Sequence, residues 1–197
     1  MAERQRPLAR FYGLLTPALQ RARLRAAAPY LGASPVLDVG CGLTDLPSRL
    51  AGYVGTDRDP DVLAECVRRH PAALFVPWDV GASPAPRDVA ALGPYPLALM
   101  LAILEHLDEP EAAVARVSPL LAPGGRLVTT TPHPAGRALL EAGARIGLLS
   151  AHADEEHEDL LSLSRLASLG EAAGLALVGY RRFVLGLNQL AVFEKRS

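Results

Sequence analysis

The stretch VLDVGCGLTDL, from Val36 to Leu46, joins four mostly apolar residues to two glycines that are one residue apart. Such an apolar run is typical of a buried strand, and the glycines predict a tight turn where that strand ends. In an open parallel sheet, ligands bind beyond the carboxyl ends of the strands. Because Gly40 and Gly42 carry no side chain that would keep a ligand away, the stretch predicts a nucleotide-like cofactor at this turn. A tight turn without a ligand is the alternative.

The composition of the 197 residues predicts a single globular domain. Half of the residues are apolar, 21% are charged and the net charge is -1, which disfavours both a disordered chain and a strongly basic nucleic-acid-binding protein. Cys41 and Cys66 are too few for a disulfide framework or a four-cysteine zinc site, although one bridge stays open. The longest strongly apolar run, Leu97 to Leu104, is too short to cross a bilayer. We therefore expect a cytoplasmic protein with no membrane insertion and no nucleic-acid partner, and its oligomeric state is left open.

Apolar runs of strand length alternate with stretches of helical period, a pattern typical of an α/β fold. We predict a Rossmann-like, doubly wound sheet of seven strands with helices on both faces. The predicted strands are Val36 to Gly40, Tyr53 to Asp57, Ala73 to Val76, Leu97 to Ala102, Arg126 to Thr131, Leu175 to Phe183 and Leu187 to Lys195. The predicted helices between the first six strands are Asp45 to Ala51, Pro60 to Arg69, Arg87 to Leu92, Pro110 to Leu121 and Leu163 to Ala173. Only VLG separates the last two strands, which is too short for a helical crossover, so the last strand is predicted to be antiparallel.

The whole chain is predicted to form one domain with two additions to the sheet. Residues 1–32 are expected to form a helical cap, with a helix from about Gln5 to Tyr30 that is interrupted at Pro17. Residues 132–161 are too many for a plain connection. We expect them to contain a helix around Gly136 to Leu148 and to cover the substrate crevice.

Acidic residues at the ends of the first two strands indicate which cofactor binds. Asp57 ends the second strand nineteen residues after Asp38, and a carboxylate there can accept hydrogen bonds from both hydroxyls of a ribose. A dinucleotide site needs a small residue where Asp45 stands, because a pyrophosphate meets the start of a helix there. Asp45 and Asp38 would repel a pyrophosphate, so the pattern favours a positively charged cofactor without phosphate, such as S-adenosylmethionine. Taken alone, Asp38 or Asp57 could instead cap a helix, and Asp38 could be a buried hydrogen-bonded acid.

Five motifs in order resemble the class I S-adenosylmethionine-dependent methyltransferases of the type 11 and ubiquinone-pathway-like groups, over nearly the whole chain. The motifs are VLDVGCGLTDL, YVGTDRDPDVL, FVPWDV, LALMLAILEHL and VSPLLAPGGRLVTTTP. The resemblance implies S-adenosyl-L-methionine as the cofactor and methyl transfer to a small-molecule acceptor, with O-methylation expected. It implies that Asp57 binds the ribose and that Asp79 meets the adenine amino group. The implied cofactor-binding residues are Asp38, Gly40, Cys41, Gly42, Asp57, Arg58, Asp79, Val80 and Leu101.

The chain departs from the family pattern in two of these motifs. Thr44 replaces the third glycine of the first motif. The backbone can accommodate this replacement if the following helix starts slightly farther from the ligand. Pro96 stands where the fourth motif often opens with an acid, so a catalytic or metal role of that side chain is not carried over. Backbone contacts to the cofactor from Met100 to Ala102 remain compatible with the pattern.

Histidines near the strand ends are the candidate catalytic residues. Some relatives carry an E-x-x-E-H cluster that binds a divalent ion, but Ala102 here leaves only Glu105 and His106, so no metal is predicted. His106 and His133 are candidates to orient or deprotonate an acceptor hydroxyl. The acid-rich stretch from His152 to Leu161 is interpreted as a solvated segment, with a metal site or a cationic substrate as open alternatives.

Two other function classes fit part of the pattern. A nicotinamide-dependent oxidoreductase would need a small residue in place of Asp45. A non-catalytic or regulatory protein with the same fold would bind S-adenosylmethionine without presenting an acceptor. No motif identifies the acceptor itself.

Overall fold

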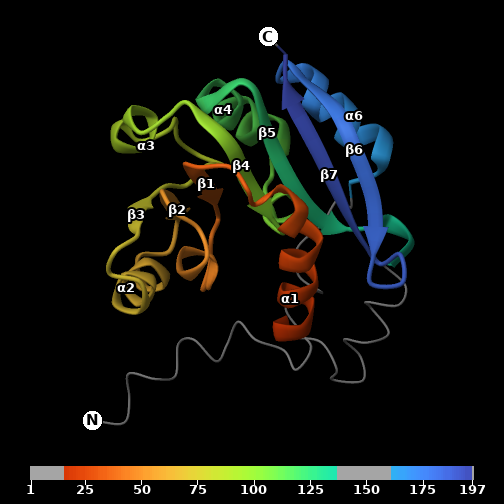
Figure 1. Ribbon diagram of the computed structural model, residues 1–197. Coiled ribbons are helices and arrows are strands. Elements are labelled where there is room, and N and C mark those ends of the chain that lie inside the picture. The colour runs from red at the N-terminus through yellow and green to blue at the C-terminus, as the bar shows by residue number, and fades with distance from the viewer. Residues whose placement is uncertain (1–15, 137–160, 197) are drawn as a thin grey trace.

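The computed structural model describes residues 16–136 and 161–196, which contain a seven-stranded sheet in the order β3-β2-β1-β4-β5-β7-β6 (Figure 1). The strands are β1 (Val36–Val39), β2 (Tyr53–Asp57), β3 (Leu74–Pro77), β4 (Tyr95–Leu101), β5 (Leu121–Pro132), β6 (Leu175–Phe183) and β7 (Asn188–Lys195). The pairs among β1 to β5 are parallel, whereas β7 is antiparallel to both β5 and β6. The predicted Rossmann-like sheet with a reversed last strand is therefore confirmed.

Most strands begin and end within two residues of their predicted positions. β4 begins earlier than predicted, at Tyr95, and its register shifts between Tyr95 and Leu97. Pro96 lies at this irregularity. Proline has no N–H group to donate to a neighbouring strand, and at this position it does not interrupt a regular ladder of hydrogen bonds. β5 also begins earlier, at Leu121, because Leu121 pairs with Tyr95 before the main ladder starts at Arg126.

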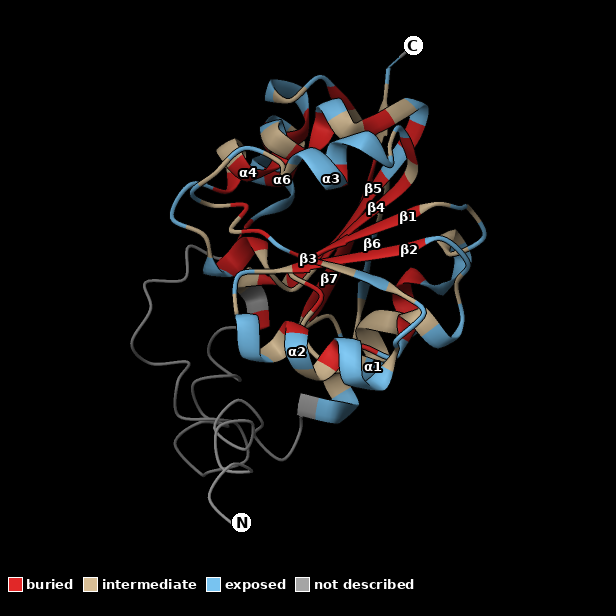
Figure 2. Cartoon of the chain, turned by 90° about the vertical axis from the view of Figure 1, so that its left-hand side faces the viewer, coloured by how far each residue is buried: buried red, intermediate tan, exposed pale blue. Residues whose placement is uncertain are grey.

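Helices cover both faces of the sheet, with α1 and α2 on one face and α3, α4 and α6 on the other (Figure 2). The α-helices are α1 (Thr16–Ala27), α2 (Pro60–Arg69), α3 (Arg87–Ala91), α4 (Pro110–Val117) and α6 (Leu163–Ala172). Shorter 3-10 turns are η2 (Ala28–Tyr30), η3 (Leu46–Ser48), η4 (Leu104–His106), η5 (Ser118–Leu120) and η6 (Pro134–Gly136). Each face has its own buried apolar cluster: Ala27 and Leu63 belong to one, and Val114 and Leu166 to the other. Side chains on both faces of the sheet are buried, which explains why the sequences of the central strands are continuous apolar runs.

The connection between β1 and β2 differs from the prediction. The predicted α-helix from Asp45 to Ala51 is wrong, since the connection contains only the 3-10 turn η3. The chain must return along a strand that rises about 13 Å over its four residues. An α-helix of the predicted seven residues covers only about 10 Å, because it advances 1.5 Å per residue. Turns and irregular segments around η3 therefore replace the helix.

The two predicted additions to the sheet fall partly outside the described residues. α1 begins at Thr16 with Pro17 in its first turn, and η2 extends this segment to Tyr30. The predicted helical residues before Thr16 lie outside the described part, and so does the predicted helix in the insertion, apart from Gly136 at the end of η6. Within residues 16–136 and 161–196, no helix has the length and apolar character that crossing a membrane requires.

Candidate functional site

A cavity of about 490 Å³ opens at the carboxyl ends of β1, β2 and β4. It lies where ligands are expected in an open parallel sheet. The nine predicted cofactor-binding residues and one predicted catalytic histidine line its wall. These residues are Asp38, Gly40, Cys41, Gly42, Asp57, Arg58, Asp79, Val80, Leu101 and His106.

The two glycines of the turn after β1 adopt left-handed backbone conformations. Gly40 has φ +68° and Gly42 has φ +53°, values that disfavour any residue with a Cβ atom. A Cβ added at Gly40 would lie 2.3 Å from Cδ1 of Ile103, whereas one added at Gly42 would meet no atom within 4 Å. Gly40 is thus favoured mainly by its backbone conformation and also by the closeness of Ile103, whereas Gly42 leaves open space at the cavity wall.

Asp57 fixes this turn at the end of β2. The Gly42 N–H donates to Oδ2 of Asp57 at 2.9 Å, and the Asp59 N–H donates to Oδ1 at 3.0 Å. Each carboxylate oxygen can accept a second hydrogen bond, so the side chain can also receive two hydroxyl groups from a ligand. The helix cap at Pro60 that the sequence left open for Asp57 is provided by Asp59, which accepts from the N–H groups of Asp61 and Val62.

Asp38 is the buried acid of the site, with 3% of its surface exposed. The Tyr53 hydroxyl donates to its Oδ2 at 2.7 Å. Burial raises the pKa of Asp38 to about 7 and the charge of Asp57 adds to the rise, while the hydrogen bond from Tyr53 opposes it. Asp38 therefore carries less negative charge at neutral pH than an exposed aspartate.

The end of β3 contributes a turn that is stabilised from the opposite face of the sheet. Oδ1 of Asp79 accepts from the Gly81 N–H at 3.0 Å. Arg116 of α4 donates through Nη1 to the carbonyls of Val80 and Gly81, at 2.8 and 2.9 Å. Trp78 is buried and donates through Nε1 to a carbonyl of the same loop. These contacts fix the position of Asp79 in the cavity wall.

Helix α1 supplies cavity residues that the sequence did not single out, namely Gln20, Arg23 and Leu24. Their spacing of three and four residues places them on one face of the helix. That periodicity was visible in the sequence, but nothing in it indicated that this face meets the glycine turn. Arg23 gives the wall a cationic side chain from outside the motifs.

The end of β4 forms the remaining wall through Leu101, Ala102 and η4. Ala102 has φ +58°, a strained conformation for a residue other than glycine, and its N–H donates to the Thr130 carbonyl at 2.8 Å. His106 is exposed at the wall, whereas Glu105 is buried. Among the residues that the structure describes, no group of three or more histidine, cysteine or acidic side chains is arranged to hold a metal ion.

His133 lies elsewhere. It follows β5, is 8% exposed, and is absent from the described cavity wall. Burial lowers its pKa, and the charge of Arg182 lowers it further. Of the two predicted catalytic histidines, the structure thus brings only His106 to the cavity.

Asp45 lies in a different setting from the one that the sequence predicted. Asp45 is exposed and is absent from the described cavity wall, and the turn after β1 leads into the 3-10 turn η3 and not into an α-helix. The helix start that was predicted to place Asp45 against a pyrophosphate is therefore absent, and the repulsion stays a prediction. Four other acids do line the wall, Asp38, Asp57, Asp59 and Asp79, and they leave the site poorly suited to phosphate groups.

The two cysteines are free thiols beside the turn, so the bridge that the sequence left open is not formed. Sγ of Cys66 donates to the Gly42 carbonyl at 3.2 Å. The hydrogen bond with the Cys66 thiol, together with burial, raises the pKa of Cys41. Cys41 is therefore a neutral thiol in the cavity wall.

Residues 4–179 match a family model described as a methyltransferase domain. The chain belongs to this methyltransferase family. The family assignment confirms the predicted class of S-adenosylmethionine-dependent methyltransferases, and the arrangement of the glycine turn and strand-end acids agrees with it. The chain is 32% identical over 156 residues to the ubiquinone biosynthesis O-methyltransferase of Xanthomonas euvesicatoria pv. vesicatoria (strain 85-10). The match covers 75% of this chain and 64% of that protein, so the chain spans less than two thirds of its relative's length.

Solved structures share the fold of this methyltransferase at low sequence identity. The S-adenosylmethionine-dependent methyltransferase of Mesorhizobium loti superposes with a TM-score of 0.68 at 17% identity, covering 92% of this chain and 98% of that one. The putative methyltransferase of Haloferax volcanii, in complex with the Trm112 methyltransferase activator, superposes with a TM-score of 0.70 at 12% identity and covers 92% of each chain. At these identities the likeness concerns the fold alone.

Proposed function

We propose that this methyltransferase transfers the methyl group of S-adenosylmethionine to a hydroxyl group of a small molecule. The observation that carries the proposal is the cavity whose wall combines a bare glycine turn with the carboxylates of Asp57 and Asp79. The similarity to ubiquinone biosynthesis O-methyltransferases supports oxygen as the acceptor atom. The two free thiols support a reducing, cytoplasmic location.

The residues around the cavity fit this cofactor. The open space beside Gly42 admits a ligand against the backbone of the turn. Asp57 is proposed to accept the two ribose hydroxyls, and Asp79 to accept from the adenine amino group. Arg23 and Arg58 both bring a cationic side chain to the wall, and either can pair with the carboxylate of the methionine end. When bound, the cofactor supplies a methyl group attached to a positively charged sulfur. The neutral thioether that remains after the transfer is a good leaving group.

The chain itself positions the two reactants, excludes water and controls the proton of the acceptor hydroxyl. We assign the last role to His106, because it lies in the cavity wall on η4, directly after the end of β4. An imidazole there can accept the proton of an acceptor hydroxyl, which makes the oxygen a better nucleophile. His133 stays a candidate from the sequence only.

Titration calorimetry tests the cofactor assignment. We expect the wild-type protein to bind S-adenosylmethionine and not NAD. Asp57→Ala should abolish measurable binding, because both ribose acceptors are lost. Asp61→Ala is the matched control, since Asp61 is an exposed acid of α2 outside the cavity wall. Equal affinity of Asp57→Ala and wild type would refute the ribose role.

Radiolabelled methyl transfer to a panel of hydroxylated small molecules tests the reaction. We expect His106→Ala to bind the cofactor normally and to transfer methyl groups about 100-fold more slowly. Tight cofactor binding without transfer to any member of the panel, or to a cell extract, would favour the non-catalytic alternative.

A further inference from the structure

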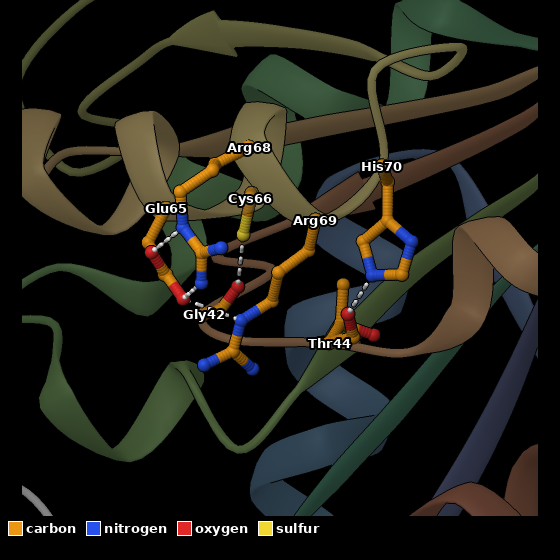
Figure 3. Close-up of polar contacts among 7 residues, drawn as sticks. All are labelled: Gly42, Thr44, Glu65, Cys66, Arg68, Arg69 and His70. Carbon is orange, nitrogen blue, oxygen red and sulfur yellow. Dashed lines mark hydrogen bonds and ion pairs between the residues drawn. The ribbon is translucent and has the colours of Figure 1, made fainter.

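Three consecutive carbonyls of the glycine turn accept hydrogen bonds from side chains outside the β1–β2 connection. Cys66 of α2 donates through Sγ to the Gly42 carbonyl at 3.2 Å. Gln20 of α1 donates through Nε2 to the Leu43 carbonyl at 2.9 Å. The third contact joins Nε2 of His70 to the Thr44 carbonyl at 3.0 Å. Figure 3 shows the contacts from Cys66 and His70, which come from the end of α2.

The absence of an α-helix from this connection explains why these carbonyls need such partners. In an α-helix each carbonyl accepts from the N–H group four residues later. Here η3 is the only helical turn of the connection, and it begins after Thr44, at Leu46. Buried backbone carbonyls that lack an internal partner must be satisfied by other groups. Side chains of α1 and α2 provide these groups.

The contact at Thr44 also indicates which ring nitrogen of His70 is the donor. A carbonyl only accepts hydrogen bonds, so Nε2 of His70 must carry the hydrogen. In the neutral ring, Nδ1 is then an acceptor, and the Ser48 hydroxyl lies 3.3 Å from it. His70 therefore bonds to the connection both before and within η3. Its own N–H donates to the Cys66 carbonyl at 2.8 Å, which ties it to the end of α2.

The opposite side of the same turn forms the cavity wall. Gly42, Leu43 and Thr44 line the cavity, and the Gly42 N–H donates to Asp57. Cys66 and His70 are not part of the described wall. Any effect they have on a ligand must therefore pass through the backbone of the turn.

We propose that Gln20, Cys66 and His70 are positioning residues that hold the glycine turn in the conformation that binds the cofactor. Together they replace the helix that the short connection lacks. The inference rests on the proposed binding of S-adenosylmethionine in this cavity. It adds residues of α1 and α2 that belong to none of the five sequence motifs.

The test compares His70→Ala, which removes the donor, with His70→Gln, whose amide nitrogen can replace Nε2 as a donor. We expect His70→Ala to bind S-adenosylmethionine about five- to tenfold more weakly in calorimetry at 20 °C, and His70→Gln to recover most of that loss. Arg68→Ala is the matched control, because Arg68 is an exposed residue of α2 that pairs with Glu65 and does not contact the turn (Figure 3). Its affinity should equal that of the wild type.

Thermal unfolding without ligand separates positioning from general stability. A purely structural role would lower the melting temperature of His70→Ala and leave the affinity of the folded protein within twofold of wild type, and this result would overturn the inference. If His70→Ala does not fold, Cys66→Ala against Cys66→Ser provides the same comparison, since serine keeps a hydroxyl donor. Failure of the wild-type protein to bind S-adenosylmethionine would instead refute the proposed function, so the two failures are distinguishable.

Discussion

At the scale of single residues, Asp38 links the core to the cavity. Its backbone belongs to β1, and its side chain is buried yet lines the cavity. Because burial raises the pKa of Asp38 to about 7, the proton on this side chain is exchanged near neutral pH. The folded protein therefore holds a proton that the unfolded chain releases near pH 4.

The raised pKa of Asp38 predicts a specific pH dependence of stability. The folded state binds more protons than the unfolded state between about pH 4 and pH 7, so this residue lowers the free energy of unfolding as the pH rises through that range. The loss is on the order of 4 kcal/mol. Asp38→Asn keeps an acceptor for Tyr53 and removes the titration. We expect urea unfolding to show an advantage of Asp38→Asn over wild type that grows from pH 4.5 to pH 8, and a constant difference would contradict the assignment.

At the scale of elements, the turn between β6 and β7 contains an unusual backbone. Val184 has φ +50° and Leu185 has φ +54°, although neither residue favours the left-handed region. The side chain of Leu185 is 99% exposed, so it gains nothing from packing. Tight hairpin turns with left-handed backbone conformations usually contain asparagine or glycine. The hairpin ladder and the hydrogen bond from the Gly186 N–H to the Phe183 carbonyl hold the turn despite this cost.

Relief of this strain predicts a stabilising substitution. Leu185→Gly should raise the free energy of unfolding by about 1 kcal/mol, because glycine adopts the required φ without penalty. Leu92→Gly is the control: Leu92 is also an exposed leucine, but its φ is -85°, and it should lose stability. Urea unfolding of the two variants gives the comparison. A loss of stability in both would show that the turn stores no strain.

At the scale of the whole molecule, the cavity joins segments that lie far apart in the chain. Its wall extends from Gln20 of α1 to Leu107 after η4 and includes the ends of β1, β2 and β4. Unfolding separates these segments, so a ligand of the cavity binds the folded state alone. Ligand binding must then stabilise the entire domain.

This linkage predicts a thermal shift. S-adenosylmethionine at 100 times its dissociation constant should add about 2.7 kcal/mol to the free energy of unfolding. For a domain of this size, the melting temperature should rise by about 5 to 10 °C. ATP at the same concentration should produce no comparable shift, because its phosphates would face the acidic wall. The shift should also disappear in Asp57→Ala, and its persistence there would place the ligand elsewhere.

The sequence by itself determined the number of strands and their succession along the chain, the reversal of the last one and the glycine turn with Asp57 and Asp79 near strand ends. These features follow from apolar period, connection length and residue type over a few neighbouring positions. Only the tertiary structure decided the order of the strands in the sheet, the absence of an α-helix from the first connection and the position of Asp45 outside the described cavity wall. It also brought the side chains of Gln20 and His70 to the carbonyls of the turn. The physical reason is that these outcomes depend on the distance the chain must cover and on contacts between residues more than twenty positions apart.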